Sequence, residues 1–95
     1  LTENYVLQAL IASGIKPYYY AFDNRYEIDF IIQYKNEIVP IEVKSSENVN
    51  NTSLKVYNEK YAPKTRVRFS MKNLNKDDNL INIPLFMVEY LDRLI

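Results

Sequence analysis

The stretch that decides the fold covers residues 27–46 and reads EIDFIIQYKNEIVPIEVKSS. Polar and apolar residues alternate along it on both sides of the pair Lys35-Asn36. Alternation with a period of two is typical of strands with one buried face, and a short polar pair between two such runs indicates a hairpin turn. We therefore predict a strand over 26–34, a turn at 35–36 and a second strand over 37–45.

The two predicted strands have matching apolar faces, which fix how they pair. A slip of one residue would mix the apolar and polar faces, so burial selects a single register. That register places Asp29 opposite Glu42 and Glu27 opposite Lys44. On the apolar side it pairs Ile28 with Val43 and Phe30 with Ile41, within a face made of Tyr26, Ile28, Phe30, Ile32, Tyr34, Val39, Ile41 and Val43.

Two carboxylates on directly opposed strand positions repel each other. For Asp29 and Glu42 at about 5 Å the repulsion is below ~1 kcal/mol in bulk water, but about 3 kcal/mol at an effective dielectric near 20. A fully exposed pair would be tolerated, whereas a half-buried pair calls for a compensating cation. Lys44 is one candidate for that cation, and a bound divalent ion is another.

The rest of the chain supplies helices and further strands around this hairpin. Because a helix falls between the third and fourth strands, that pair is open to a parallel arrangement through a crossover. We predict an α/β fold in the order α-β-β-β-α-β-α, with a central mixed sheet of about four strands flanked by helices. Before the hairpin we predict a helix over 2–12, capped by Thr2 and ended by Ser13-Gly14, and a strand over 16–22. After the hairpin we predict a polar loop over 46–52, a helix from Thr52 or Ser53 to about Ala62, and a strand over 65–71. The chain then continues with a charged loop over 72–79, a short extended piece at Ile81 and Ile83, and a final helix from Pro84.

Composition narrows the chemistry that the chain can carry. Its 95 residues predict one domain, 1–95, and the start at Leu1, already inside a predicted helix, indicates a piece of a larger protein. The absence of cysteine and histidine removes thiolate and imidazole metal sites, so any metal would have oxygen ligands, as Mg²⁺, Mn²⁺ and Ca²⁺ prefer. A formal net charge of zero counts mildly against autonomous DNA binding. No apolar run approaches the ~20 residues of a membrane span, and a cysteine-free chain is compatible with the cytoplasm.

Three acidic residues and a lysine stand in an order that resembles the PD-(D/E)XK nuclease superfamily. In that superfamily an Asp on one strand is followed by (D/E)-x-K on the next, as Asp29 in EIDFII is followed here by Glu42-Val43-Lys44 in IEVKSS. Glu3 in TENYVLQAL stands where the superfamily often adds a helix carboxylate. More narrowly, ENYVLQAL, PYYY, EIDFII, VPIEVKSS, SLKVY, VRFS and NIPLF together resemble the uncharacterised C-terminal domain of bacterial and archaeal AAA-type ATP-binding proteins.

The resemblance implies a restriction-endonuclease-like core, an upstream ATPase domain in the same chain, DNA as a possible partner and no nucleotide site within these residues. It also implies a role for each site residue. Asp29 and Glu42 would coordinate Mg²⁺ or Mn²⁺ together with the Val43 carbonyl, and Glu3 would bind directly or through water. Lys44 would orient the attacking water or neutralise developing charge. Ser53 and Tyr57 would have at most a supporting role.

Each of these residues also has a plain structural interpretation. Glu3 suits a helix N-terminus in any case, and Glu42 and Lys44 could belong to a surface charge cluster with Glu27. Tyr57 fits a core position. For Arg66 and Arg68 the sequence favours a solvated strand face over contact with phosphate.

Three functions therefore remain open: a metal-dependent nuclease fused to an ATPase, a catalytically silent scaffold of the ATPase, and a nucleic-acid-binding module that does not cleave. The oligomeric state also remains open.

Overall fold

The computed structural model describes residues 1–45 and 52–95, and the predicted polar loop over 46–52 lies outside them except for Thr52. The α/β class is confirmed. In chain order the elements are α1 (Thr2–Ala12), β1 (Tyr18–Phe22), β2 (Tyr26–Tyr34), β3 (Glu37–Val43), α2 (Ser53–Tyr61), β4 (Arg66–Ser70), β5 (Asn75–Asp77), β6 (Leu80–Pro84), the 3₁₀ helix η1 (Leu85–Tyr90) and α3 (Leu91–Leu94).

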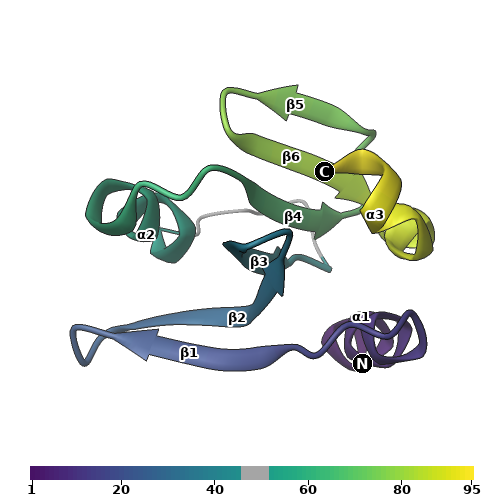
Figure 1. The fold of residues 1–95 in the computed structure, drawn as a ribbon, viewed down its shortest axis with the longest axis horizontal. Helices are drawn as coiled ribbons and strands as arrows, with labels where there is room; N and C mark the ends of the chain where they lie inside the picture. The colour runs from purple at the N-terminus through teal and green to yellow at the C-terminus, as the bar shows by residue number, and fades with distance from the viewer. Residues whose placement is uncertain (46–51) are drawn as a thin grey trace.

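Within the described residues the sheet has six strands, in the order β1-β2-β3-β4-β6-β5, so the prediction of about four strands is wrong (Figure 1). β1, β2 and β3 form an antiparallel meander. β3 pairs parallel with β4 across the α2 crossover, as predicted, and β4 pairs parallel with β6. The additional strand β5 lies within the predicted charged loop. All three of its residues are exposed, so no alternation marks it in the sequence.

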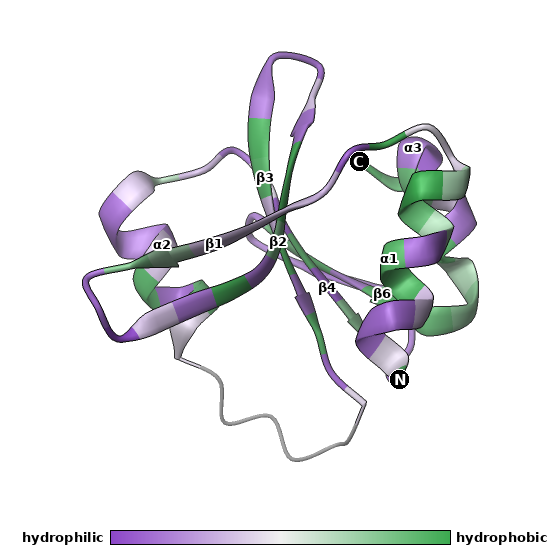
Figure 2. Cartoon of the chain, turned by 90° about the horizontal axis from the view of Figure 1, so that it is seen from below, coloured by the Kyte–Doolittle hydropathy of each residue, from purple (hydrophilic) through white to green (hydrophobic). Residues whose placement is uncertain are grey.

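Helices cover both faces of the sheet, and each face has its own core. Figure 2 shows the sheet between α2 on one side and α1 with α3 on the other. The larger core lies under α1, η1 and α3, and the smaller one lies under α2. The larger core comprises Val6, Leu10, Phe30, Ile32, Val39, Ile41, Val67, Phe69, Ile81, Ile83, Val88 and Leu91, and the smaller comprises Phe22, Ile28, Leu54 and Tyr57.

β2 contributes to both cores because it contains a β-bulge. Tyr20 pairs with Ile28 but Tyr18 pairs with Ile31, so two residues of β2 oppose the single Tyr19 between them. An extra residue on one strand reverses its alternation and bends it, as the sharp turn of β2 in Figure 1 shows. The predicted continuous apolar face is therefore wrong: Ile28 belongs to the α2 core, whereas Phe30 belongs to the α1 core.

The tight turns follow the sequence closely, whereas several element ends do not. Lys35 and Asn36 both have positive φ, 50° and 67°, as a two-residue hairpin turn requires, and Gly14 has the predicted left-handed φ of 81°. Thr2 is the first residue of α1 and not its cap, since Leu1 holds the N-cap position without a side-chain hydrogen bond.

The remaining ends shift by small amounts. The strand predicted over 16–22 begins at Tyr18. The final helix begins with 3₁₀ geometry after Pro84 and becomes α-helical only at Leu91. Within the described ranges, no helix is long and apolar enough to cross a membrane.

Candidate functional site

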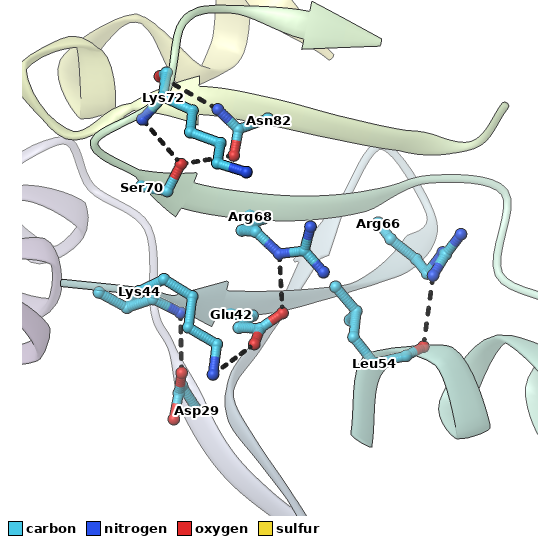
Figure 3. Close-up of polar contacts among 10 residues, drawn as sticks. Asp29, Glu42, Lys44, Leu54, Arg66, Arg68, Ser70, Lys72 and Asn82 are labelled. Carbon is cyan, nitrogen blue, oxygen red and sulfur yellow. Dashed lines mark hydrogen bonds and ion pairs between the residues drawn. The ribbon is translucent and has the colours of Figure 1, made fainter. Parts of the chain in front are cut away.

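The predicted register of the β2–β3 hairpin is confirmed from Tyr34–Glu37 to Phe30–Ile41, where the ladder ends. The predicted pairs Asp29–Glu42, Glu27–Lys44 and Ile28–Val43 are wrong, because the bulge turns β2 away from β3 at this point. Beyond the ladder a side chain replaces the backbone as hydrogen-bond acceptor. The Val43 N–H donates to Asp29 Oδ2 over 2.8 Å (Figure 3). The Asp29 carboxylate is thus fixed against the backbone of β3, next to Glu42.

Glu42 is a buried carboxylate held between two cations. Its Oε1 lies 3.2 Å from Lys44 Nζ, and its Oε2 accepts a hydrogen bond from Arg68 Nε over 3.0 Å. Lys44 reaches Glu42 because residues two apart on a strand share a face. Arg68 reaches it because the parallel register of β3 and β4 places the two residues side by side. The side chain of Glu42 is only 3 % exposed, so these cations supply the compensation that burial of a charge requires.

The two arginines of β4 do not lie on a solvated face, contrary to the prediction. Both are partly buried on the face that α2 covers. The Arg66 guanidinium donates from Nε and Nη2 to Asn79 Oδ1, at 3.0 and 2.8 Å, and from Nη1 to the Leu54 carbonyl at 3.5 Å. Burial, and then the charge of Arg68, lower the pKa of Arg66. Arg66 therefore holds the turn before β6, whereas Arg68 belongs to the Glu42 cluster.

The electrostatics of Asp29 link the predicted site residues. Burial raises the pKa of the Asp29 carboxyl above its ordinary value, and the hydrogen bond from Val43 lowers it in part. The charges of Glu3 and Glu42 raise this pKa further, and Lys44 lowers it. The other three predicted catalytic residues, Glu3, Glu42 and Lys44, therefore all lie close enough to Asp29 to influence its carboxyl group.

Glu3 approaches the site from the first turn of α1 and is exposed there. It lines a hollow of about 460 Å³ that reaches Asp29 and is bordered by Tyr19 and Tyr20 of β1. A second hollow of about 440 Å³ joins Glu3 to Val43 and Ser45. Glu3 thus faces the end of the hairpin without closing over it. Tyr57, in contrast, is buried in the α2 core, which agrees with its structural interpretation.

The donor set indicates which metal the site would suit. Over residues 1–45 and 52–95, no three acidic side chains gather closely enough to form a closed cage for an ion. Mg²⁺ rarely uses such a cage, because it is usually bound by one or two carboxylates and completed by waters and substrate phosphates. Asp29 and Glu42, joined through the backbone of Val43, fit that open arrangement. An ion there would have to draw Glu42 partly away from Lys44 or Arg68.

The fold and the site define a small α/β domain with a mixed sheet and a cluster of acidic and basic groups at the end of its hairpin. The profile of the family described as "Domain of unknown function (DUF4143)" matches residues 1–87. The chain belongs to this family, and the match includes Glu3, Asp29, Glu42 and Lys44. The searches of curated proteins and of solved structures returned no match.

Proposed function

We propose that this domain is the PD-(D/E)XK nuclease-like, C-terminal part of an AAA-type ATPase, and that it hydrolyses phosphodiester bonds in nucleic acid with a divalent ion. The observation that carries the proposal is the junction at the end of the hairpin. Asp29 is bonded there to the Val43 N–H, beside the Glu42–Lys44 ion pair. The same junction brings together Asp29, Glu42 and Lys44, the residues on which the resemblance to the superfamily rests. We place the protein in the cytoplasm, with its ATPase domain and DNA as partners.

Each residue has a role that its surroundings support. Asp29 and Glu42 would hold Mg²⁺ or Mn²⁺ with the Val43 carbonyl, and Glu3 would contribute through a water. A bound ion of this kind lowers the pKa of a coordinated water and stabilises negative charge on a phosphodiester. Lys44, whose ammonium lies 3.2 Å from Glu42, would orient the water beside that carboxylate. Burial, and after it the charges of Glu3 and Glu42, raise the pKa of the Asp29 carboxyl, and a divalent cation bound there would favour its ionised form.

A second candidate function is that of a silent scaffold for the ATPase. It is favoured by Arg68, which together with Lys44 already neutralises Glu42 without any metal. A site that needs no ion to compensate its buried carboxylate is stable as a purely structural feature. The formal net charge of zero agrees with this alternative as well.

Cleavage assays on the full-length protein separate the two candidates. Labelled single-stranded DNA, duplex DNA and RNA would each be incubated with Mg²⁺ or Mn²⁺. We expect the wild type to cleave at least one of them, and Lys44→Ala to lose about 100-fold or more in rate. Lys60→Ala is the matched control, because Lys60 is an exposed lysine of α2 that pairs with Asp23 instead of the site. Cleavage unchanged in Lys44→Ala would remove this lysine from the mechanism. A wild type inert on all three substrates would favour the scaffold.

A further inference from the structure

We propose that Arg68 binds a phosphate group of the nucleic-acid substrate and forms, with Lys44, a two-cation clamp above the carboxylate of Glu42. The inference deepens the proposed function and rests on it for the identity of the substrate. Arg68 lies outside the Asp and Glu-x-Lys positions that carry the resemblance. It enters the site only through the pairing of β4 with β3.

The guanidinium of Arg68 uses only part of its hydrogen-bonding capacity within the fold. Its Nε donates to Glu42 Oε2, and Figure 3 shows this nitrogen turned onto the carboxylate. Nη1 and Nη2 donate to no other residue in the described parts of the chain, and the side chain is 22 % exposed. An arginine fixed through Nε while its two terminal nitrogens remain available can bind a phosphate in a bidentate manner.

Arg66 provides an internal comparison on the same strand face. All three of its guanidinium nitrogens donate to Asn79 or to the Leu54 carbonyl, so its donors serve the fold. Arg68 makes one such bond. The contrast between two arginines in nearly the same setting indicates that the free donors of Arg68 are not needed for packing.

The exposed fractions of the Glu42, Lys44 and Arg68 side chains also favour an anion as the ligand. The side chain of Glu42 is 3 % exposed, whereas those of Lys44 and Arg68 are each 22 % exposed. The carboxylate of Glu42 therefore lies beneath two cations, and the exposed parts of these two side chains face outward. A phosphodiester held there would lie next to Glu42 and Lys44, where the proposed hydrolysis needs it.

DNA binding without metal tests the proposal independently of hydrolysis. The full-length protein would be titrated against labelled single-stranded and duplex oligonucleotides in EDTA, with anisotropy as the readout at several salt concentrations. We expect Arg68→Gln to weaken binding about 10-fold and to reduce the salt slope by about one. Arg68→Lys, which keeps the charge but loses the planar fork, should give an intermediate affinity. Arg93→Gln is the control, because Arg93 lies on α3, where its guanidinium packs over the ring of Tyr90. This variant should bind as the wild type does.

Glu42→Gln supplies a second variant should Arg68→Gln fail to fold. Removing the carboxylate frees Arg68 and raises the positive charge of the clamp, so metal-free binding should become several-fold tighter. Weaker binding by Glu42→Gln, or wild-type affinity and salt slope in Arg68→Gln, would overturn the proposal, as would a wild type that binds neither oligonucleotide in EDTA.

Inorganic phosphate, added at constant ionic strength, separates a nucleic-acid backbone from free phosphate as the ligand. We expect it to displace the oligonucleotide no better than chloride does. Displacement at submillimolar phosphate would overturn the assignment to nucleic acid. The protein could bind in EDTA through Arg68 and still show no metal-dependent cleavage. That result would support the clamp, and it would contradict only the proposed hydrolysis.

Discussion

Arg68 and Glu42 form a hydrogen-bonded ion pair across two parallel strands, with 3.0 Å between Arg68 Nε and Glu42 Oε2. Lys44 binds the other carboxylate oxygen. A buried pair of this kind contributes little net stability, because both charges lose hydration on folding. Removing one partner is costly, however, because the charge that remains is still buried. The cluster is therefore expected to be sensitive to single substitutions and tolerant of a matched double substitution.

Arg68→Met should destabilise the domain by about 3 kcal/mol, the lower end of the range for breaking a buried pair, since Lys44 still compensates Glu42. The double variant Glu42→Gln/Arg68→Met should recover much of that loss, because no buried carboxylate is left and the remaining cation, Lys44, is partly exposed and lies near Asp29. Urea unfolding of the two single variants and the double variant measures the coupling. Additive losses would show that the pair does not act as a unit.

Asp29→Asn should stabilise the metal-free protein at neutral pH. The folded pKa of Asp29 is raised above its unfolded value, chiefly by burial. Its contribution to stability is therefore fully present below the unfolded pKa near 4 and is lost as pH rises through the folded pKa. Asparagine keeps an acceptor for the Val43 N–H but carries no charge. The gain in melting temperature over the wild type should shrink as pH falls toward 4, and a gain independent of pH would contradict this account.

Glu3→Gln should lower the pKa of Asp29, because Glu3 is the largest of the carboxylate charges that raise it. A carbon-detected NMR titration of the Asp29 carboxyl would measure the shift. Glu89→Gln, a change at an exposed carboxylate of η1, is the matched control and should leave the titration unchanged. An Asp29 titration identical in Glu3→Gln and the wild type would mean that α1 does not bring Glu3 near the site.

The hairpin shows how far sequence reasoning extends. Strict alternation on both sides of Lys35-Asn36 sufficed to predict the strand bounds of β2, the turn, and the register from Tyr34–Glu37 to Phe30–Ile41. The bulge escaped prediction because both faces of β2 carry apolar residues around Asp29, so a reversal of the alternation leaves no mark in the sequence.

Other features depend on tertiary pairing. β5 has no apolar residue, and it forms only because β6 offers an edge to pair with. Of the candidate site, the sequence pointed to Glu3, Asp29, Glu42 and Lys44 only through their resemblance to the order of residues in the PD-(D/E)XK superfamily. It could not place Arg68 beside Glu42, because the register of two strands joined by a long crossover is not set by a local turn.

Asn36→Gly should stabilise the domain slightly, by less than about 1 kcal/mol, because the steric relief at positive φ is partly offset by the conformational entropy that glycine loses on folding. Asn36 has a φ of 67°, and glycine adopts this left-handed conformation without steric cost. Asn36→Val should be destabilising by a similar amount or more, because a β-branched residue tolerates positive φ poorly. Thermal melts of the two variants test the turn. A stabilised Asn36→Val would contradict the observed geometry.

The central claim is that Asp29 and Glu42 form a divalent-ion site, and Mn²⁺ binding to the full-length protein without nucleotide tests it most directly. Calorimetric titration should show that the wild type binds Mn²⁺. In Asp29→Asn this binding should be lost or at least 10-fold weaker. Asp77→Asn, which changes an exposed carboxylate of β5, should retain it. Equal Mn²⁺ affinity in the wild type and Asp29→Asn, or no binding by the wild type, would contradict the claim.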